Sequence, residues 1–337
     1  MHAVDIHTHV VPADFPPYAG KGTNPRWPQM HLASDCRHGN VMIEGKNFRT
    51  VTDECWDVGR RVEAMAKAGV GRQVLSPMPE LLSYWFSDED ALAFGAHVND
   101  TIAGIVARDP DHFIALGMVP LQNPELAARE LEKLMRGGVF RGVEIGTNVN
   151  GTPVGDPRFE PFFAAAEQLG ASIFVHALHP AIGPRLVGPP MLANFIGFPC
   201  ENAFAIASLM TSGMLERHPR LKLAFSHGGG VFAMILPRLA KGCAMQPDLA
   251  ERIGRSPYEH ARRLYYDTLV YSEAALGFLI ESFGLRQLCV GTDFPFDIRD
   301  NAPLEPIAVR LASLGLGDAE RKLLHSENAL RFLGLDG

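Results

Sequence analysis

Short, almost wholly apolar runs alternate along the chain with longer stretches in which apolar residues recur every three or four positions. A continuous apolar run is typical of a strand buried on both faces of a parallel sheet, whereas the longer spacing indicates an amphipathic helix. The expected strands are Ala3–His9, Arg72–Pro77, Phe113–Pro120, Gly142–Thr147, Ser172–Ala177, Leu221–His227, Leu264–Leu269 and Leu288–Thr292. The helical patterns cover Val58–Ala68, Ala91–Arg108, Pro124–Arg136, Phe159–Leu169, Ala203–Arg217 and Glu273–Phe283.

The alternation of eight strands with helices predicts an α/β fold of the (β/α)8 TIM barrel type. A doubly wound open sheet is the alternative, but such sheets usually carry a glycine-rich phosphate loop, and neither GxGxxG nor GxxxxGK[ST] occurs here. A plain barrel takes roughly 250 residues, and we assign most of the surplus to two segments that follow strands, 10–56 and 178–201. We expect residues 1–337 to form a single barrel domain, with the small insertion 10–56 after strand one covering the carboxyl-terminal mouth.

Composition excludes several classes of protein. The chain is 47% hydrophobic and 20% charged, which supplies a large core and argues against global disorder. Its net charge of −7, without any run of Lys or Arg, makes nucleic acid or an anionic membrane an unexpected partner. No apolar stretch approaches the roughly 18 residues of a membrane span, and the first residues, MHAVDIHTH, do not resemble a signal peptide. These features predict a cytoplasmic enzyme.

Ionisable side chains stand at the ends of four expected strands. His7 and His9 lie two residues apart on strand one, so both imidazoles face the same side. His176 and His227 end strands five and six, and Asp293 follows strand eight. An HxH pair alone is more often a pair of core histidines than a ligand pair, but active sites of barrels are built where these four strand ends meet. Imidazoles with one carboxylate suit Zn²⁺ or a similar divalent ion, and a coordination position left open for water makes such a site catalytic.

The phrases DIHTH, FSHGGG, GTDFPF and NFR around these residues resemble the amidohydrolase superfamily. They are most similar to its decarboxylase branch, typified by 2-amino-3-carboxymuconate-6-semialdehyde decarboxylase (ACMSD), and the resemblance extends over essentially the whole chain. It implies a carboxy-lyase, a metal-dependent, non-oxidative decarboxylase of a small unsaturated or aromatic carboxylic acid, acting in the catabolism of aromatic compounds. One divalent metal would be the cofactor, with Zn²⁺ favoured and Mn²⁺ as the alternative, and no organic cofactor is expected.

The resemblance also implies roles for individual residues. The ligands of the single metal would be His7, His9, His176 and Asp293. His227 would act beside the metal water as its acid/base partner, with Asp293 as the other member of the catalytic machinery. Arg49, in NFR, would bind the substrate carboxylate, and Phe296 would line the pocket. Arg238 matches an arginine that reaches the site of the neighbouring subunit, which implies a homodimer.

Other interpretations stay open at this point. A hydrolase or hydratase of the same superfamily would use metal hydroxide as its nucleophile, and a barrel with a purely structural metal would have no activity. Strand four, RGVEIGTN, has no lysine that could bridge two metals, which favours one metal over a second ion held by Glu144. From spacing alone, Arg49 and Arg238 would be ordinary arginines of a hairpin and a helix surface. The segment after strand five lacks the tryptophan that the resemblance predicts near Phe195, so the exact substrate is undecided.

Overall fold

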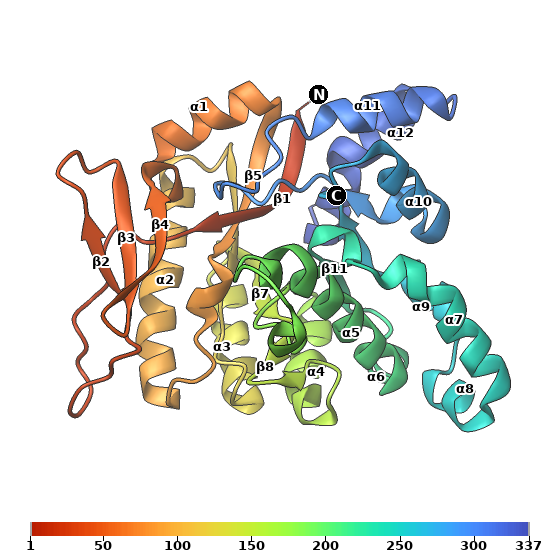
Figure 1. Ribbon diagram of the computed structural model, residues 1–337, viewed down its shortest axis with the longest axis horizontal. Coiled ribbons are helices and arrows are strands. Elements are labelled where there is room, and N and C mark those ends of the chain that lie inside the picture. Colours follow the sequence, from red (N-terminus) through yellow and green to blue (C-terminus); the bar gives the residue numbers. More distant parts are fainter. Residues whose placement is uncertain (1, 336–337) are drawn as a thin grey trace.

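A computed structural model describes residues 2–335 of the chain. Eight parallel strands follow one another around a barrel in sequence order (Figure 1). They are β1 (Ala3–Val10), β5 (Val70–Pro77), β6 (Phe113–Gly117), β7 (Phe140–Gly146), β10 (Ser172–His176), β11 (Lys222–Phe225), β12 (Tyr265–Asp267) and β13 (Leu288–Cys289). Beyond β13 the chain continues along β1, where the Ile6 N–H donates to the Val290 carbonyl and Thr8 forms a parallel bridge with Phe294. The predicted barrel is confirmed, and each expected strand overlaps one of these eight.

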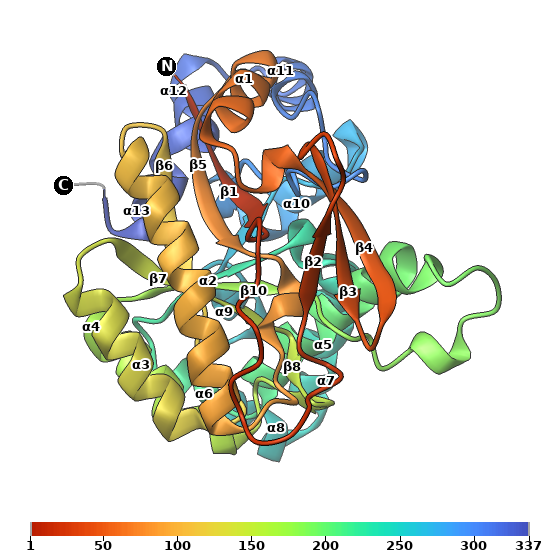
Figure 2. The same ribbon diagram turned by 90° about the vertical axis from the view of Figure 1, so that its left-hand side faces the viewer.

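Helices surround the barrel strands and cover one end of the barrel (Figures 1 and 2). They are α1 (Val58–Ala68), α2 (Asp88–Arg108), α3 (Pro124–Arg136), α4 (Glu160–Leu169), α5 (Phe198–Thr211), α6 (Met214–Arg217), α7 (Phe232–Met245), α8 (Pro247–Ile253), α9 (Pro257–Ala261), α10 (Glu273–Phe283), α11 (Leu304–Ser313), α12 (Asp318–Lys322) and α13 (Asn328–Leu333). The helix expected over 203–217 is two helices, because Gly213 adopts a left-handed conformation with φ of 76° and ends the regular helix before it. Within residues 2–335 no helix is long and apolar enough to cross a bilayer.

A three-stranded antiparallel sheet follows β1 and stands beside the barrel (Figure 2). Its strands are β2 (Gln29–Leu32), β3 (His38–Ile43) and β4 (Lys46–Thr52). The turn between β3 and β4 places Glu44 and Gly45 at φ of 53° and 70°, the two positive values that a tight hairpin turn requires. This hairpin carries Arg49 on β4. A small hairpin, β8 (Asn148–Val149) with β9 (Thr152–Pro153), follows β7.

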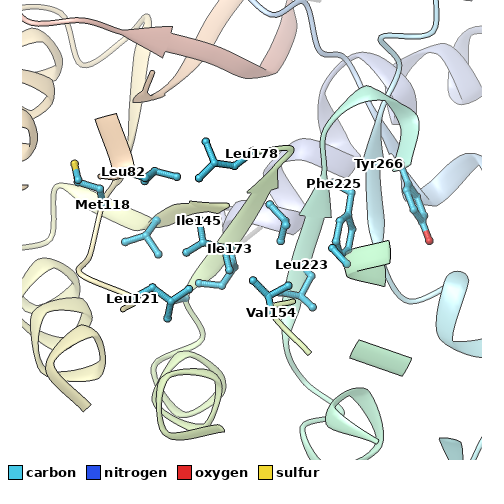
Figure 3. Packing of buried hydrophobic residues seen from close by; sticks show 14 of the residues in the cluster. Leu82, Met118, Leu121, Ile145, Val154, Ile173, Leu178, Leu223, Phe225 and Tyr266 are labelled. Carbon is cyan, nitrogen blue, oxygen red and sulfur yellow. The ribbon is translucent and has the colours of Figure 1, made fainter. Parts of the chain in front are cut away.

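Apolar side chains fill the space between the strands and the helices. Figure 3 shows part of this core, in which Ile145, Ile173 and Leu223 of neighbouring strands lie close together. Inside the barrel, a second cluster occupies the amino-terminal half of the strands. Its buried members are Val4, Ile6, Val74, Ile114, Leu116, Phe174, Ala224, Cys289, Ala329, Phe332 and Leu333. The last three belong to α13, so this helix closes the lower end of the barrel and leaves the carboxyl-terminal end for polar residues.

Candidate active site

Four side chains at the carboxyl ends of three barrel strands converge inside the barrel. Ligand atoms of His7, His9, His176 and Asp293 all lie within 4.8 Å of one another, and all four residues are buried. The two β1 histidines share one face, as expected for alternate residues, and their ring centroids are 5.0 Å apart. We call these four residues the ligand cluster. The structure thus brings together the four residues that the sequence analysis expects around a metal.

In each histidine of the ligand cluster, one ring nitrogen is held by an acceptor and the other faces the centre. The Nδ1 atom of His7 lies 2.6 Å from Oδ2 of Asp267, that of His9 lies 3.0 Å from the Pro77 carbonyl, and that of His176 lies 2.8 Å from the Ala177 carbonyl. The carbonyl oxygens can only accept, so Nδ1 of His9 and of His176 carries the proton and Nε2 keeps its lone pair. All three Nε2 atoms and Oδ1 of Asp293 are buried without a well-aligned hydrogen-bond partner, although Oδ1 lies 3.1 Å from Nε2 of His9 and 3.4 Å from that of His7.

Such orphaned nitrogen and oxygen atoms are rare in folded proteins because burying them without a partner costs free energy. Three converging imidazole nitrogens and one carboxylate oxygen form the donor set that a divalent first-row metal prefers. The residues present therefore fit a metal ion, which would satisfy all four atoms at once. Glu144 of β7 lies nearby, with its Oε2 at 2.5 Å from the Ser76 hydroxyl, but it is not part of the ligand cluster.

Asp267, at the end of β12, organises this site and was missed by the sequence analysis. Besides His7, its carboxylate accepts hydrogen bonds from the backbone N–H groups of His227 and Gly228, each at 2.8 Å, and from that of Leu269 at 3.0 Å. One buried carboxylate thus fixes both the His7 ring and the backbone of His227. The available signal was a carboxylate inside the seventh expected strand, in the run RLYYDTL.

His227 lies at the edge of the ligand cluster. Its Nε2 is 4.0 Å from Oδ2 of Asp293, and its ring centroid is about 5 Å from those of His7 and His176 (5.2 and 5.1 Å). The amide nitrogen of Asn202 lies 3.3 Å from Nδ1, and since this nitrogen can only donate, Nδ1 accepts and the proton sits on Nε2. With 14% of its side chain exposed, His227 is more accessible than the ligand cluster. It can therefore meet both a bound molecule and the cluster.

The charges inside the barrel are unevenly distributed. Burial lowers the pKa of His9 and, together with the neighbouring imidazoles, lowers that of His176 well below its ordinary value. Burial also opposes the charge on His7, but the Asp293 and Asp267 carboxylates outweigh it and raise the pKa of His7 to about 10. For Asp293, His7 and the other imidazoles outweigh burial and hold its pKa well below the usual range. Without a metal, the cluster therefore holds one imidazolium between two carboxylates.

Arg49 and Phe296 extend the site outward. The guanidinium carbon of Arg49 lies 4.4 Å from the ring centroid of Phe296, and that ring stacks on His9 at a centroid distance of 5.3 Å. The Nη2 atom of Arg49 also donates to Oε1 of Glu80 at 2.9 Å. The structure thus connects both predicted substrate residues to the ligand cluster. It adds Glu80, a partner of Arg49 on the turn after β5 that the sequence analysis did not identify.

Arg238 is not brought to the site. It is exposed on α7, and within residues 2–335 no hydrogen bond, ion pair or ring contact joins it to the ligand cluster. On α7 and the preceding turn, Val231, Met234 and Ile235 are also exposed, at 41, 72 and 38% of their surface. The expected role of Arg238 requires a second chain, so the geometry of one chain leaves it a prediction.

A family model described as Amidohydrolase matches residues 4–335. The chain is 34% identical over 334 residues to 2-amino-3-carboxymuconate-6-semialdehyde decarboxylase of Dictyostelium discoideum, covering 99% of this chain and 92% of that protein. It is 25% identical over 301 residues to gamma-resorcylate decarboxylase of Rhizobium radiobacter, covering 82% of this chain and 87% of the relative.

Solved structures share the fold. The apo form of Metarhizium anisopliae IDCase superimposes with a TM-score of 0.82 at 22% identity, covering 100% of this chain and 98% of the other. A dihydroxybenzoic acid decarboxylase from Polaromonas sp. JS666, described with bound manganese and the inhibitor 2-nitroresorcinol, gives a TM-score of 0.75 at 20% identity, covering 100% and 98%.

Proposed function

Because the chain belongs to the amidohydrolase family, and within it to the ACMSD-like branch of carboxy-lyases, we propose that it is a metal-dependent, non-oxidative decarboxylase of a small unsaturated or aromatic carboxylic acid. The resemblance noted in the sequence is confirmed at the level of this branch. The observation that carries the proposal is the set of four buried, unpartnered donor atoms in the ligand cluster, beside an accessible histidine and a stacked arginine.

We propose His7, His9, His176 and Asp293 as the metal ligands. Zn²⁺ is favoured by the three imidazole nitrogens, and Mn²⁺ is the alternative because a structural neighbour is described with that ion. When bound, such an ion supplies a Lewis acid and lowers the pKa of coordinated water. Asp267 keeps the His7 ring in place, as outer partners of metal-bound histidines do in other sites.

The side chains around the ligand cluster divide the remaining work. Arg49 offers a planar guanidinium that pairs with the substrate carboxylate, and Phe296 packs against the unsaturated part of the substrate. His227 passes a proton from Nε2 to the carbon that bears the carboxylate and takes up another from water before the next turnover. The π electrons of the substrate take up that proton. The C–C bond then breaks, its electron pair restores the π system, and CO2 leaves, so one proton replaces one carboxylate.

We also propose that the enzyme is a homodimer in which Arg238 reaches the site of the partner subunit. Apolar side chains are exposed on two neighbouring surfaces, the arm between β10 and α5 and the helices α5 and α7. On the arm between β10 and α5, which projects from the barrel in Figure 2, Val187 is 96% and Phe195 is 53% exposed. On the adjacent helices, Phe204 of α5 is 53% and Met234 of α7 is 72% exposed, and Arg238 lies one turn further along α7.

The activity is tested with protein stripped of metal and reloaded with Zn²⁺ or Mn²⁺. We expect CO2 release from at least one member of a panel of small aromatic and unsaturated carboxylic acids, and none from the metal-free protein. His227→Asn should retain the metal and lose turnover, whereas His112→Asn, which removes a half-exposed histidine paired with Asp109, should behave as wild type. No CO2 with any acid, together with solvent ¹⁸O in an organic product, would favour the hydrolase or hydratase instead.

The dimer is tested by light scattering and by complementation. Coexpressed Arg238→Ala and His227→Asn chains should recover part of the activity that each variant lacks alone, because a mixed dimer holds one site with both residues. A monomer in solution, or no recovery in a proven mixed dimer, would overturn the shared site.

A further inference from the structure

Arg61, on α1, is a fully buried arginine, and neither the ligand cluster nor the substrate residues include it. No carboxylate within the described part of the chain lies at ion-pair distance from its guanidinium. The preceding residue, Arg60, is a contrasting case, since it is 41% exposed and pairs with Asp53 and Glu63 at the surface. A buried charge without a counter-charge is costly, so the contacts of Arg61 require an explanation.

The guanidinium of Arg61 binds three different segments of the barrel mouth. Its Nη1 donates to the carbonyl of His9 at 2.9 Å and to that of Glu54 at 3.0 Å. Nη2 donates to the hydroxyl of Thr8 at 3.2 Å, and Nε donates to Oε1 of Gln73 at 3.2 Å. The fork of donors on one arginine therefore joins the end of β1, the middle of β5 and the short helical turn Asp53–Cys55 that follows β4.

The same guanidinium packs on the residue after Asp293. The Phe294 ring contacts two arginines, with Cζ of Arg61 at 4.9 Å and Cζ of Arg299 at 5.0 Å from its centroid. The Phe294 carbonyl accepts a hydrogen bond from the N–H of His9 at 2.7 Å. The backbone of His9 is thus held on both sides, through its N–H by Phe294 and through its carbonyl by Arg61.

We propose that Arg61 is a positioning residue for the metal centre. It fixes His9 and, through Phe294, the backbone that carries Asp293, and it ties the end of the hairpin bearing Arg49 to both. Its role is to hold two ligands, from β1 and from the segment after β13, at the separation that one ion requires. A Met or Leu of similar size would fill the same space at a lower cost of desolvation, but it would leave the carbonyls of His9 and Glu54 without donors.

The inference rests on the proposed metal site but not on the reaction, so it is tested by metal binding alone. Metal-free Arg61→Met, Arg61→Lys and Arg60→Met are titrated with Mn²⁺, with free Mn²⁺ followed by EPR, or with Zn²⁺ in competition with a chromophoric chelator. We expect Arg61→Met to bind the ion roughly 10- to 100-fold more weakly, the range typical of lost outer partners of metal ligands. Arg61→Lys should be intermediate, because one ammonium cannot reach all four acceptors, and Arg60→Met should match wild type.

The outcomes separate this inference from the proposed function. A folded Arg61→Met protein, judged by circular dichroism, with wild-type metal affinity would show that Arg61 serves stability alone and would overturn the inference while leaving the enzyme intact. The positioning role would also be contradicted if Arg61→Lys bound the metal no more tightly than Arg61→Met. If Arg61→Met does not fold, the Arg61→Lys and Arg60→Met affinities decide the question, since a positioning role requires Arg61→Lys to be weaker than Arg60→Met. A wild-type protein that binds neither ion would overturn the proposed function itself, and this inference with it.

Discussion

The two halves of the barrel interior are equally buried but chemically opposite. Around the amino-terminal half of the strands, the inward side chains are apolar, among them Ile6 and Leu116, and neither is exposed at all. His7 stands one residue after Ile6 on β1, His176 stands two residues after Phe174 on β10, and Asp293 follows the end of β13; their inward nitrogen and oxygen atoms have no hydrogen-bond partner. We call the apolar cluster around the amino-terminal half of the strands the lower layer, and the ligand cluster with the residues that hold it the upper layer.

This contrast separates residues that stabilise the fold from residues that serve a ligand. A buried leucine gains free energy by leaving water, whether or not anything binds. A buried imidazole nitrogen without a partner costs free energy until an ion occupies the centre. Substitutions in the lower layer should therefore change stability without changing metal affinity, and substitutions in the upper layer should do the opposite.

The largest effect is expected from His176→Ala. Removing one of the four ligands should abolish detectable turnover and weaken metal binding by more than the roughly 100-fold seen for outer partners. Without metal, the variant should lose some stability with the buried ring and its Nδ1 hydrogen bond to the Ala177 carbonyl, but less than Leu116→Ala loses, and unlike wild type it should gain little stability when metal is added. Elemental analysis after dialysis and chemical denaturation with and without metal measure the two effects. A large loss of stability in the metal-free protein would contradict the division between the layers.

Leu116→Ala, in the lower layer, should give the reverse result. Leu116 is fully buried on β6, and truncating such a leucine typically costs about 2–5 kcal/mol of unfolding free energy. The folded variant should bind metal as wild type does, since Leu116 belongs to the apolar cluster below the ligands. Urea denaturation and metal titration check both statements. A change in metal affinity as large as that in His176→Ala would show that the two layers are coupled.

The same contrast explains which parts of the site could be predicted from the sequence. Strands buried on both faces appear as continuous apolar runs, so their ends could be located, and the histidines and Asp293 stand where those runs stop. Five strands, β6, β10, β11, β12 and β13, are shorter than expected. After β11, the chain turns at His227 with φ of 53°, and after β12 the Asp267 carboxylate accepts the backbone N–H of Leu269. These turns depend on tertiary contacts that periodicity does not report.

Residues that act through partners distant in sequence could not be predicted. Asp267 is 260 residues from His7, and Glu80 is 31 residues from Arg49, so no local spacing connects either pair. Arg61 lies next to Arg60 in an amphipathic helix, where both look like surface charges, yet only Arg60 is one. The strand β2 was also missed, because its four residues, QMHL, are too few to show a period and most of them are exposed.

Asp267→Asn should have a smaller effect than loss of a ligand. The carboxylate accepts four hydrogen bonds, from His7 and from three backbone N–H groups, whereas an asparagine would turn its NH2 group toward one of these donors. We expect metal affinity to fall roughly 10- to 100-fold, as for other outer partners. Titration of the metal-free variant measures this. An affinity equal to that of wild type would show that the His7 ring is held by packing alone.

The expected effect most specific for the upper layer is the pH dependence of metal binding, which is small for any single step in pH. In the metal-free protein the pKa of His7 is raised to about 10, chiefly by Asp293 with Asp267, so His7 holds an extra proton at pH 8. A metal must displace that proton, whereas His9 and His176, whose pKa values are lowered, are already neutral. Affinity should therefore rise about tenfold per pH unit up to about pH 10 and then level off.

Calorimetry at pH 8 in two buffers of different ionisation enthalpy counts the protons released. One proton per ion is expected for the wild type. Asp267→Asn removes one of the two charges that raise the pKa of His7, so it should release fewer protons. Leu116→Ala should release as many protons as wild type. If the wild type released no proton, His7 would already be neutral at pH 8 in the metal-free protein. Asp293 and Asp267 would then not stabilise a protonated His7 in the absence of the metal.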